Sequence, residues 1–108
     1  MIQHSLGEFQ ELVLLCVAVL HGEAYGVAIL KKLQAETGKK FNVSAVHVAL
    51  KRMEEKGFVE SAYGGITNER GGRRKKFYQI TALGKRMLDE QYQLRTRMYQ
   101  GIPNISFS

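Results

Sequence analysis

The sequence predicts one mainly α-helical domain with a small β hairpin, and three observations support this fold class. Its 108 residues are enough for one hydrophobic core and too few for two. Three segments with the apolar spacing of a helix come first, and a glycine follows each of them. Two short strand-like segments around a glycine-rich basic stretch come next, before a fourth helical segment.

The first two helices are expected over residues 6–20 and 25–37. The first is apolar on nearly all sides from Leu12 onward, which is typical of a helix packed against several neighbours. It ends before Gly22. Gly38 follows the second helix, where a residue in the left-handed conformation is needed. Both helices are therefore expected to belong to the core.

The third helix has the clearest start and end. Ser44 is a favourable N-cap residue, and Gly57 follows the charged last turn. Apolar residues at steps of three and four predict one buried stripe, which consists of Val46, Ala49, Leu50 and Met53. The opposite, solvent-exposed face is expected to carry Ala45, His47, Val48, Lys51, Arg52 and Glu55.

A hairpin and a last helix complete the chain. Strands are expected over residues 58–63 and 73–80, joined by the polar, glycine-rich residues 64–72. Thr81 then caps a helix over residues 82–100, which ends at a Gly-Ile-Pro sequence.

Several classes of protein are excluded by residue usage. The longest apolar run, residues 12–20, is shorter than the roughly 20 residues that cross a bilayer, and no secretory leader is recognisable, so we expect a cytoplasmic protein. The single cysteine, Cys16, excludes an internal disulfide; a buried thiol is favoured over a redox or catalytic one. The histidines, His4, His21 and His47, are scattered, and the sequence has no phosphate-binding loop. No metal, cofactor or catalytic activity is expected.

The net charge of +6 is unevenly distributed. Residues 1–30 hold three acidic side chains and no lysine or arginine, whereas residues 31–56 hold seven basic and three acidic ones. Residues 57–76 add five basic and two acidic side chains. Clustered cations favour binding to a phosphate backbone, because they release its condensed counterions. By itself, the charge is equally compatible with an ordinary solvated surface.

The order helix, helix, helix, basic hairpin, helix is that of a winged helix-turn-helix domain. In such domains the third helix enters the major groove of DNA, and the hairpin, or wing, contacts the flanking backbone. A basic hairpin that only stays solvated and blunts its own edge is the alternative. The expected DNA-binding residues are Ser44, Ala45, His47, Val48, Lys51, Arg52, Arg70, Arg73, Arg74, Lys75 and Lys76.

Three stretches resemble PadR-like transcriptional regulators, in the short form with a single C-terminal helix. Residues 43–59 are similar to the third helix of that family, and residues 71–84 to its wing strand and the start of its last helix. Residues 21–26, His-Gly-Glu-Ala-Tyr-Gly, resemble its turn into the second helix. The similarity extends over residues 9–100.

The resemblance implies DNA binding as a homodimer and, usually, repression. It divides the chain into a winged-helix DNA-binding domain (1–81), a dimerisation helix (82–101) and a flexible tail (102–108). The last helix would pack on the first helix and core of the partner, through Phe9, Val13, Met87, Leu88, Leu94, Met98 and Tyr99. Independently, this helix carries more apolar surface than a lone trailing helix can bury. The alternative is that it folds back on its own domain.

Two features depart from the family pattern. The family usually has tyrosine at the position of His47, often followed by proline where this chain has Val48, so base preference is not carried over. Some short members bind planar drugs against an aromatic side chain between the paired last helices. That position is Arg95 here, with Tyr92 and Tyr99 nearby, so an anionic or other small-molecule effector is as reasonable as a stacked drug.

The expected partners are double-stranded DNA, a second copy of the chain and, where an effector exists, a small molecule; no membrane is expected. The alternative is a non-catalytic winged-helix module that binds protein or RNA. The basic wing indicates a polyanion without choosing among them.

Overall fold

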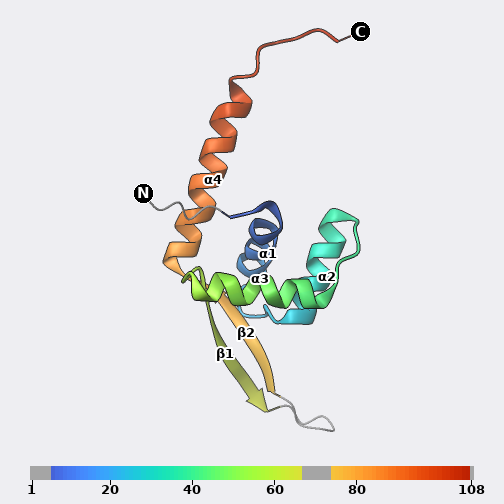
Figure 1. Cartoon of the computed structure of the whole chain (residues 1–108), viewed down its shortest axis with the longest axis vertical. Helices are drawn as coiled ribbons and strands as arrows, with labels where there is room; N and C mark the ends of the chain where they lie inside the picture. The colour runs from blue at the N-terminus through green and yellow to red at the C-terminus, as the bar shows by residue number, and fades with distance from the viewer. Residues whose placement is uncertain (1–5, 67–73, 108) are drawn as a thin grey trace.

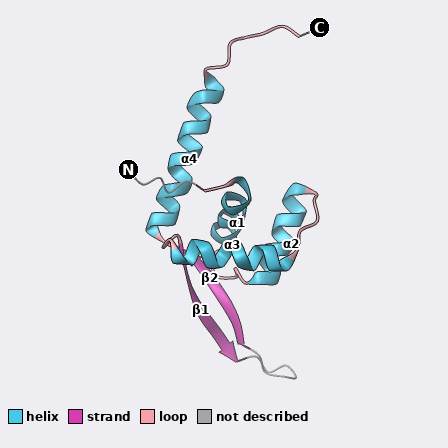
Figure 2. Cartoon of the chain, viewed as in Figure 1, coloured by secondary structure: helices cyan, strands magenta, loops and turns pink. Residues whose placement is uncertain are grey.

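The computed structural model describes residues 6–66 and 74–107, and for residues 65 and 66 it describes the backbone alone. The described part contains four helices and a two-stranded antiparallel hairpin (Figures 1 and 2). The elements are, in order, α1 (Glu8–Val19), α2 (Gly26–Thr37), α3 (Val43–Glu55), β1 (Val59–Ile66), β2 (Arg74–Ile80) and α4 (Ala82–Gln100). The predicted fold class is confirmed.

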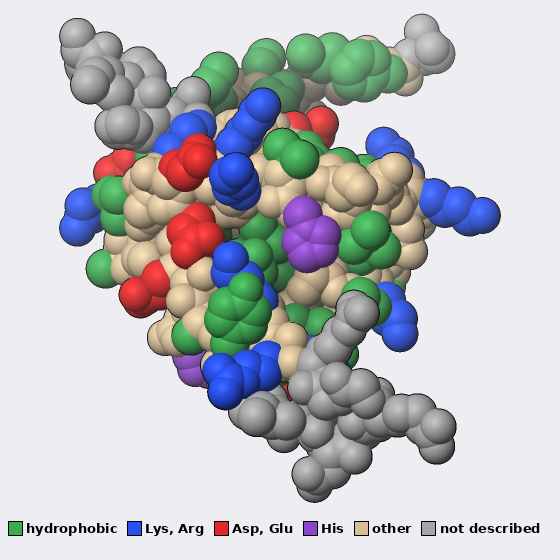
Figure 3. Space-filling view, turned by 60° about the horizontal axis from the view of Figure 1, so that its bottom comes forward, with side chains coloured by type: hydrophobic (Ala, Val, Ile, Leu, Met, Phe, Trp, Pro, Cys, Tyr) green, Lys and Arg blue, Asp and Glu red, His purple; other side chains and the backbone are tan. Residues whose placement is uncertain are grey.

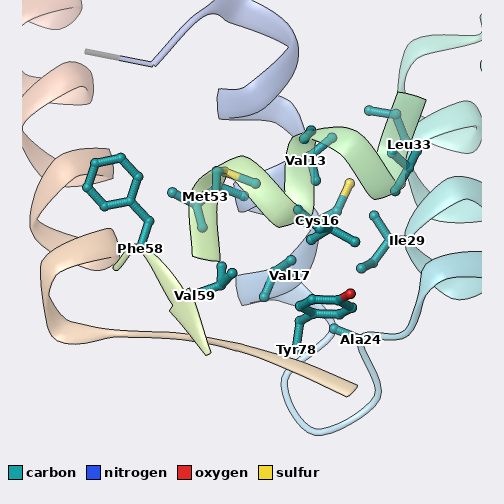
Figure 4. Close-up of a cluster of buried hydrophobic side chains, with 14 of the residues drawn as sticks. Val13, Cys16, Val17, Ala24, Ile29, Leu33, Met53, Phe58, Val59 and Tyr78 are labelled. Carbon is teal, nitrogen blue, oxygen red and sulfur yellow. The ribbon is translucent and has the colours of Figure 1, made fainter. Parts of the chain in front are cut away.

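The core lies where α1, α2 and α3 meet the base of the hairpin. Val13 and Val17 of α1 pack with Ile29 and Leu33 of α2, and Tyr78 of β2 closes the cluster from below (Figure 4). The predicted stripe of α3 is confirmed, since all four of its residues are buried. Cys16 is also buried in this cluster, as expected for a thiol that packs as a small apolar side chain.

The start of α3 differs from the prediction. Asn42, not Ser44, is the N-cap: its Oδ1 accepts a hydrogen bond of 2.7 Å from the backbone N–H of Ser44, which lies inside the helix. Both residue types cap helices well. The choice depends on the preceding chain, where the Phe41 N–H donates to Oε1 of Gln34 and the Phe41 ring packs on Phe9, with centroids 5.4 Å apart.

The hairpin pairs from Val59 opposite Ile80 to Ile66 opposite Arg74, with an irregularity between Tyr63 and Ile66. It therefore starts one residue later than predicted and continues three residues further along β1. Its base is attached to the loop before α2, because the Tyr78 N–H donates to the Ala24 carbonyl at 2.8 Å.

Helix α4 begins as predicted. The Thr81 side chain accepts from the Gly84 N–H at 3.0 Å and donates to the Gly57 carbonyl at 2.6 Å. Gly84 lies so close to the Phe58 carbonyl that a Cβ atom would collide with it. These contacts hold the first turn of α4 against the end of α3.

Further along, α4 leaves the domain. Gln91 contacts α1 by donating to Glu11 Oε1 at 2.7 Å, and it accepts from the Leu6 N–H at 3.0 Å. Beyond this point α4 and residues 102–107 extend away from the core, at the end of the molecule opposite the hairpin (Figure 1). In the part of the chain that the structure describes, no helix is long and apolar enough to cross a membrane.

Candidate nucleic-acid interface

The outward face of α3 is exposed as predicted. Ser44, Val48 and Lys51 lie along its middle, and Val48 keeps 51% of its surface exposed. Ala45 and Arg52 lie on the flank toward the start of α1, where both contribute to a shallow depression with Phe9 and Gln10. A helix whose exposed face is small near its start and cationic further along can approach base edges closely and bind phosphates beside them.

The wing supplies the second set of cations. Arg74, Lys75 and Lys76 are all exposed on β2. The predicted Arg70 and Arg73 lie outside the described residues. The ammonium of Lys76 lies 5.8 Å from the Tyr78 ring centroid and 5.9 Å from that of Tyr63.

One lysine from each set, Lys51 of α3 and Lys76 of β2, lines a polar depression of about 410 Å³ between α3 and the hairpin. Its basic members are His47 and Lys51 from α3 and Lys76 from β2. The face turned toward the viewer in Figure 3 shows lysine and arginine side chains spread around a histidine, with acidic side chains to one side. The tertiary structure thus brings predicted residues of the helix and the wing together.

Two acidic residues share this depression. Glu55 was expected on the outer face of α3, and Glu54 was not among the predicted site residues. Glu54 Oε2 accepts a hydrogen bond of 2.6 Å from the Ser61 hydroxyl of β1. Glu54 therefore attaches the wing to α3, and it reduces the positive charge of this side of the face.

The N-terminal end of α2 contains two residues that the sequence interpretation did not place in the site. Tyr25 contacts the wing: its ring lies beneath the Lys75 ammonium at 4.2 Å, and it meets Phe77 edge-on. Gly26 contacts α3 through His47, whose Cε1 lies 2.7 Å from where a Cβ of residue 26 would be. Both residues belong to the stretch 21–26 that resembles the family's turn into the second helix, but no local pattern predicts these contacts, because they join separate elements.

Burial changes the acidity of two side chains near these elements. Desolvation raises the pKa of the Tyr78 phenol, and the neighbouring Lys76 partly offsets this. Tyr78 is therefore a neutral hydroxyl at the edge of the depression. Desolvation also raises the pKa of the Cys16 thiol, so that the thiol stays protonated.

The residues predicted for dimerisation divide into two groups. Leu94, Met98 and Tyr99 of α4 are exposed to 48%, 69% and 75% in the single chain, so the alternative in which they fold back on their own domain is wrong. Val13 and Leu88, in contrast, are buried in the core of their own chain, at 0% and 8% exposure. These two cannot offer surface to a partner, because helix packing within the chain already covers them. Phe9 and Met87 are half-buried.

The residues of the expected effector site lie on the same exposed part of α4. Tyr92 is 69% exposed, and Tyr99 lies two turns further along the helix. Arg95 pairs with Glu11 of α1, Nη2 to Oε1 at 3.4 Å. A pocket around these side chains would need walls from a second molecule. Within the described residues, no cluster of histidine, cysteine or carboxylate side chains could hold a metal ion.

The three helices, the attached hairpin and the exposed α3 face define a winged helix-turn-helix protein. Residues 14–90 match the model of the transcriptional regulator PadR-like family. The chain therefore belongs to the PadR-like family of transcriptional regulators, whose members regulate transcription and are not enzymes.

Solved structures agree with this assignment. A PadR family transcription regulator from Clostridium difficile is 31% identical, with a TM-score of 0.63 over 82% of this chain and 91% of the other. One from Eggerthella lenta is 26% identical, with a TM-score of 0.66 over 87% and 81%. A PadR-like regulator from Bacillus cereus, 21% identical with a TM-score of 0.69 over 85% and 84%, shares the fold.

A relative from Lysinibacillus sphaericus, an uncharacterized protein, is 32% identical over 74 residues. The aligned segment covers 67% of this chain and 65% of that protein.

Proposed function

We propose that the protein is a homodimeric, sequence-specific repressor that binds double-stranded DNA. The observation that carries this proposal is the depression shared by α3 and β2, in which His47 and Lys51 lie beside Lys76. A helix inserted in the major groove places its flank next to the sugar-phosphate backbone, where a basic wing finds phosphates.

Different parts of the face would perform different tasks. Ser44, Ala45 and Val48 leave room at the start of α3 for close approach to base edges. Lys51, Arg52 and His47 would bind bases or phosphates at the groove edges. The wing cations Arg70, Arg73, Arg74, Lys75 and Lys76 would contact the backbone, and so contribute affinity on every sequence.

Dimerisation is supported by the exposed apolar side chains of α4. Leu94 and Met98 are exposed on the second half of the helix, and Ile102, Ile105 and Phe107 are exposed in the tail that follows. A second copy would cover this surface, with Phe9 and Met87 at its margin. A two-fold symmetric dimer presents two α3 helices to half-sites one helical turn apart, about 34–36 Å.

An effector would act through the same α4 region. Tyr92, Arg95 and Tyr99 of two paired helices would enclose a ligand at the dimer axis. A ligand that changed the angle between the helices would change the spacing of the α3 helices and release DNA. Arg95 favours an anionic or hydrogen-bond-accepting ligand over a purely aromatic one.

The test is fluorescence anisotropy with duplex DNA from upstream of the protein's own gene, a random duplex and a structured RNA, across a salt series. Selective binding to the upstream duplex with a steep salt dependence is expected. Equal binding to all three would favour a general polyanion-binding module. Absence of binding at low salt would favour a module that binds protein.

A further inference from the structure

We propose that Tyr25 is a positioning residue for DNA binding, which holds the wing cation Lys75 in place before DNA arrives. This inference rests on the proposed function and assigns a role to a residue that itself lies outside the predicted DNA-binding set. It concerns the contact between the turn that begins α2 and strand β2.

Three contacts define the arrangement. The Lys75 Nζ lies 4.2 Å from the centroid of the Tyr25 ring, within the range of a favourable cation–π interaction. The Tyr25 and Phe77 rings meet edge-to-face, with centroids 5.5 Å apart and an angle of 72°. The backbones of Tyr25 and Phe77 also form an isolated antiparallel bridge.

The Tyr25 ring is itself held from two sides. Tyr25 is the N-cap residue of α2, so its backbone is fixed where the helix begins. Phe77, its ring partner, packs on Gly64 so closely that a Cβ at residue 64 would lie 2.5 Å from the Phe77 ring. Tyr25 is also half-buried, whereas Lys75 is exposed. The flexible partner in this pair is therefore the lysine, and the ring determines where its ammonium lies.

This arrangement has a consequence for affinity. A free lysine side chain loses rotamer freedom when it binds a phosphate, which costs about two- to tenfold in affinity. The Tyr25 ring covers one side of the ammonium and leaves the others to solvent, where a phosphate can bind. The Lys75 side chain is thus already ordered in the folded protein, so its loss of rotamer freedom does not reduce the affinity for DNA.

The residue that follows Tyr25 also contacts α3. Gly26, the next residue, lies against His47 of α3, while Tyr25 contacts β2. A substitution of Tyr25 is therefore expected to affect the wing, whereas a substitution of Gly26 is expected to affect α3.

The experiment uses the full chain and the variants Tyr25→Leu, Tyr25→Phe, Lys75→Gln and the double variant Tyr25→Leu/Lys75→Gln. Tyr63→Leu is the matched control, since Tyr63 is an exposed tyrosine of the wing that lies near Lys76 instead. In DNA-free protein, NMR should show the ε-methylene protons of Lys75 shifted upfield by the ring current. Tyr25→Phe and Tyr63→Leu should keep this shift, and Tyr25→Leu should lose it.

On duplex DNA, Tyr25→Leu should bind two- to tenfold more weakly than the wild type, and Tyr25→Phe nearly as well as the wild type. The double variant should bind no more weakly than Lys75→Gln alone, because Tyr25 acts through Lys75. Multiplicative losses in the double variant would overturn the inference, as would an unchanged Lys75 shift in Tyr25→Leu. If the wild type bound no duplex at all, the proposed function would fail and the DNA role of Tyr25 with it, whereas the NMR result would still report the Tyr25–Lys75 contact.

Discussion

The imidazole of His47 lies directly over Gly26, with its Cε1 2.7 Å and its Nε2 2.9 Å from the place where a Cβ of residue 26 would be. This contact joins the first residue of α2 to the outward face of α3. His47 is exposed, and its ring is the free end of a side chain. The position of this ring is therefore determined by the absence of a side chain at residue 26.

We predict that Gly26→Ala displaces His47 without a large loss of stability. The imidazole can rotate into solvent, so the free energy of unfolding should change by less than about 1 kcal/mol. DNA affinity should fall if the ring contacts DNA where it now lies. Urea titration and anisotropy would measure the two effects. Gly26→Ala/His47→Ala should bind like His47→Ala alone, and independent losses would show that residue 26 acts by another route.

The wing cations should contribute affinity that is independent of sequence. Arg73→Ala/Arg74→Ala is expected to weaken binding to upstream and random duplexes alike, because phosphate contacts carry no base information. The slope of log K against log salt should become shallower by about two. Lys85→Ala is the control, since Lys85 pairs with Asp89 on α4 at 2.7 Å. Unchanged affinity in the double variant would refute a DNA-contacting wing.

The exposed stripe of α4 should determine the oligomeric state. Leu94→Glu or Met98→Glu is expected to convert a dimer into monomers, because each would bury an unpaired charge at the proposed interface. Gln93→Glu adds the same charge to an exposed residue on another side of the helix and should leave the dimer intact. Sedimentation velocity distinguishes these results. An intact dimer in both α4 variants would mean that the copies associate elsewhere.

The Cys16 thiol should react slowly in the folded protein. Burial raises its pKa, so little thiolate is present at neutral pH, and iodoacetamide should label it much faster in urea than in buffer. Because the unfolded thiol ionises at a lower pH than the buried one, the free energy of unfolding falls as pH rises from the ordinary pKa of a thiol toward the folded-state pKa. The wild type should therefore lose more stability than Cys16→Ala between pH 8 and 10. An equal loss of stability in both proteins would contradict a Cys16 pKa that is raised by burial.

Local patterns predicted some features of the site and not others. The buried stripe of α3 and the Thr81 cap follow from residues a few positions apart, and the structure confirms both. The predicted N-cap of α3, Ser44, was wrong, because Asn42 and Ser44 are both good capping residues and the local sequence does not choose between them. Packing of Phe41 on Phe9 directs the chain so that Asn42 reaches the first turn.

The apolar content of the last helix was interpreted correctly as more than its own domain could cover. The sequence did not predict, however, which apolar residues of this helix are buried and which are exposed. Leu88 faces the core at 8% exposure, whereas Leu94, less than two turns later, is open to solvent. The difference depends on where α4 passes the first turn of α1. That position is a property of the assembled domain. Val13 was misplaced for the same reason, since both faces of α1 are apolar in sequence.

The sequence by itself determined which residues of each helix face inward, because a helix repeats every 3.6 residues and its apolar stripe is a local property. It also determined that the wing is basic and that the chain belongs with PadR-like regulators. Only the tertiary structure decided which of these residues meet: His47 and Lys51 with Lys76, Tyr25 with Lys75, and Gly26 with His47. Such contacts join elements far apart in the chain, and they arise from the packing of α2, α3 and the hairpin on one shared core.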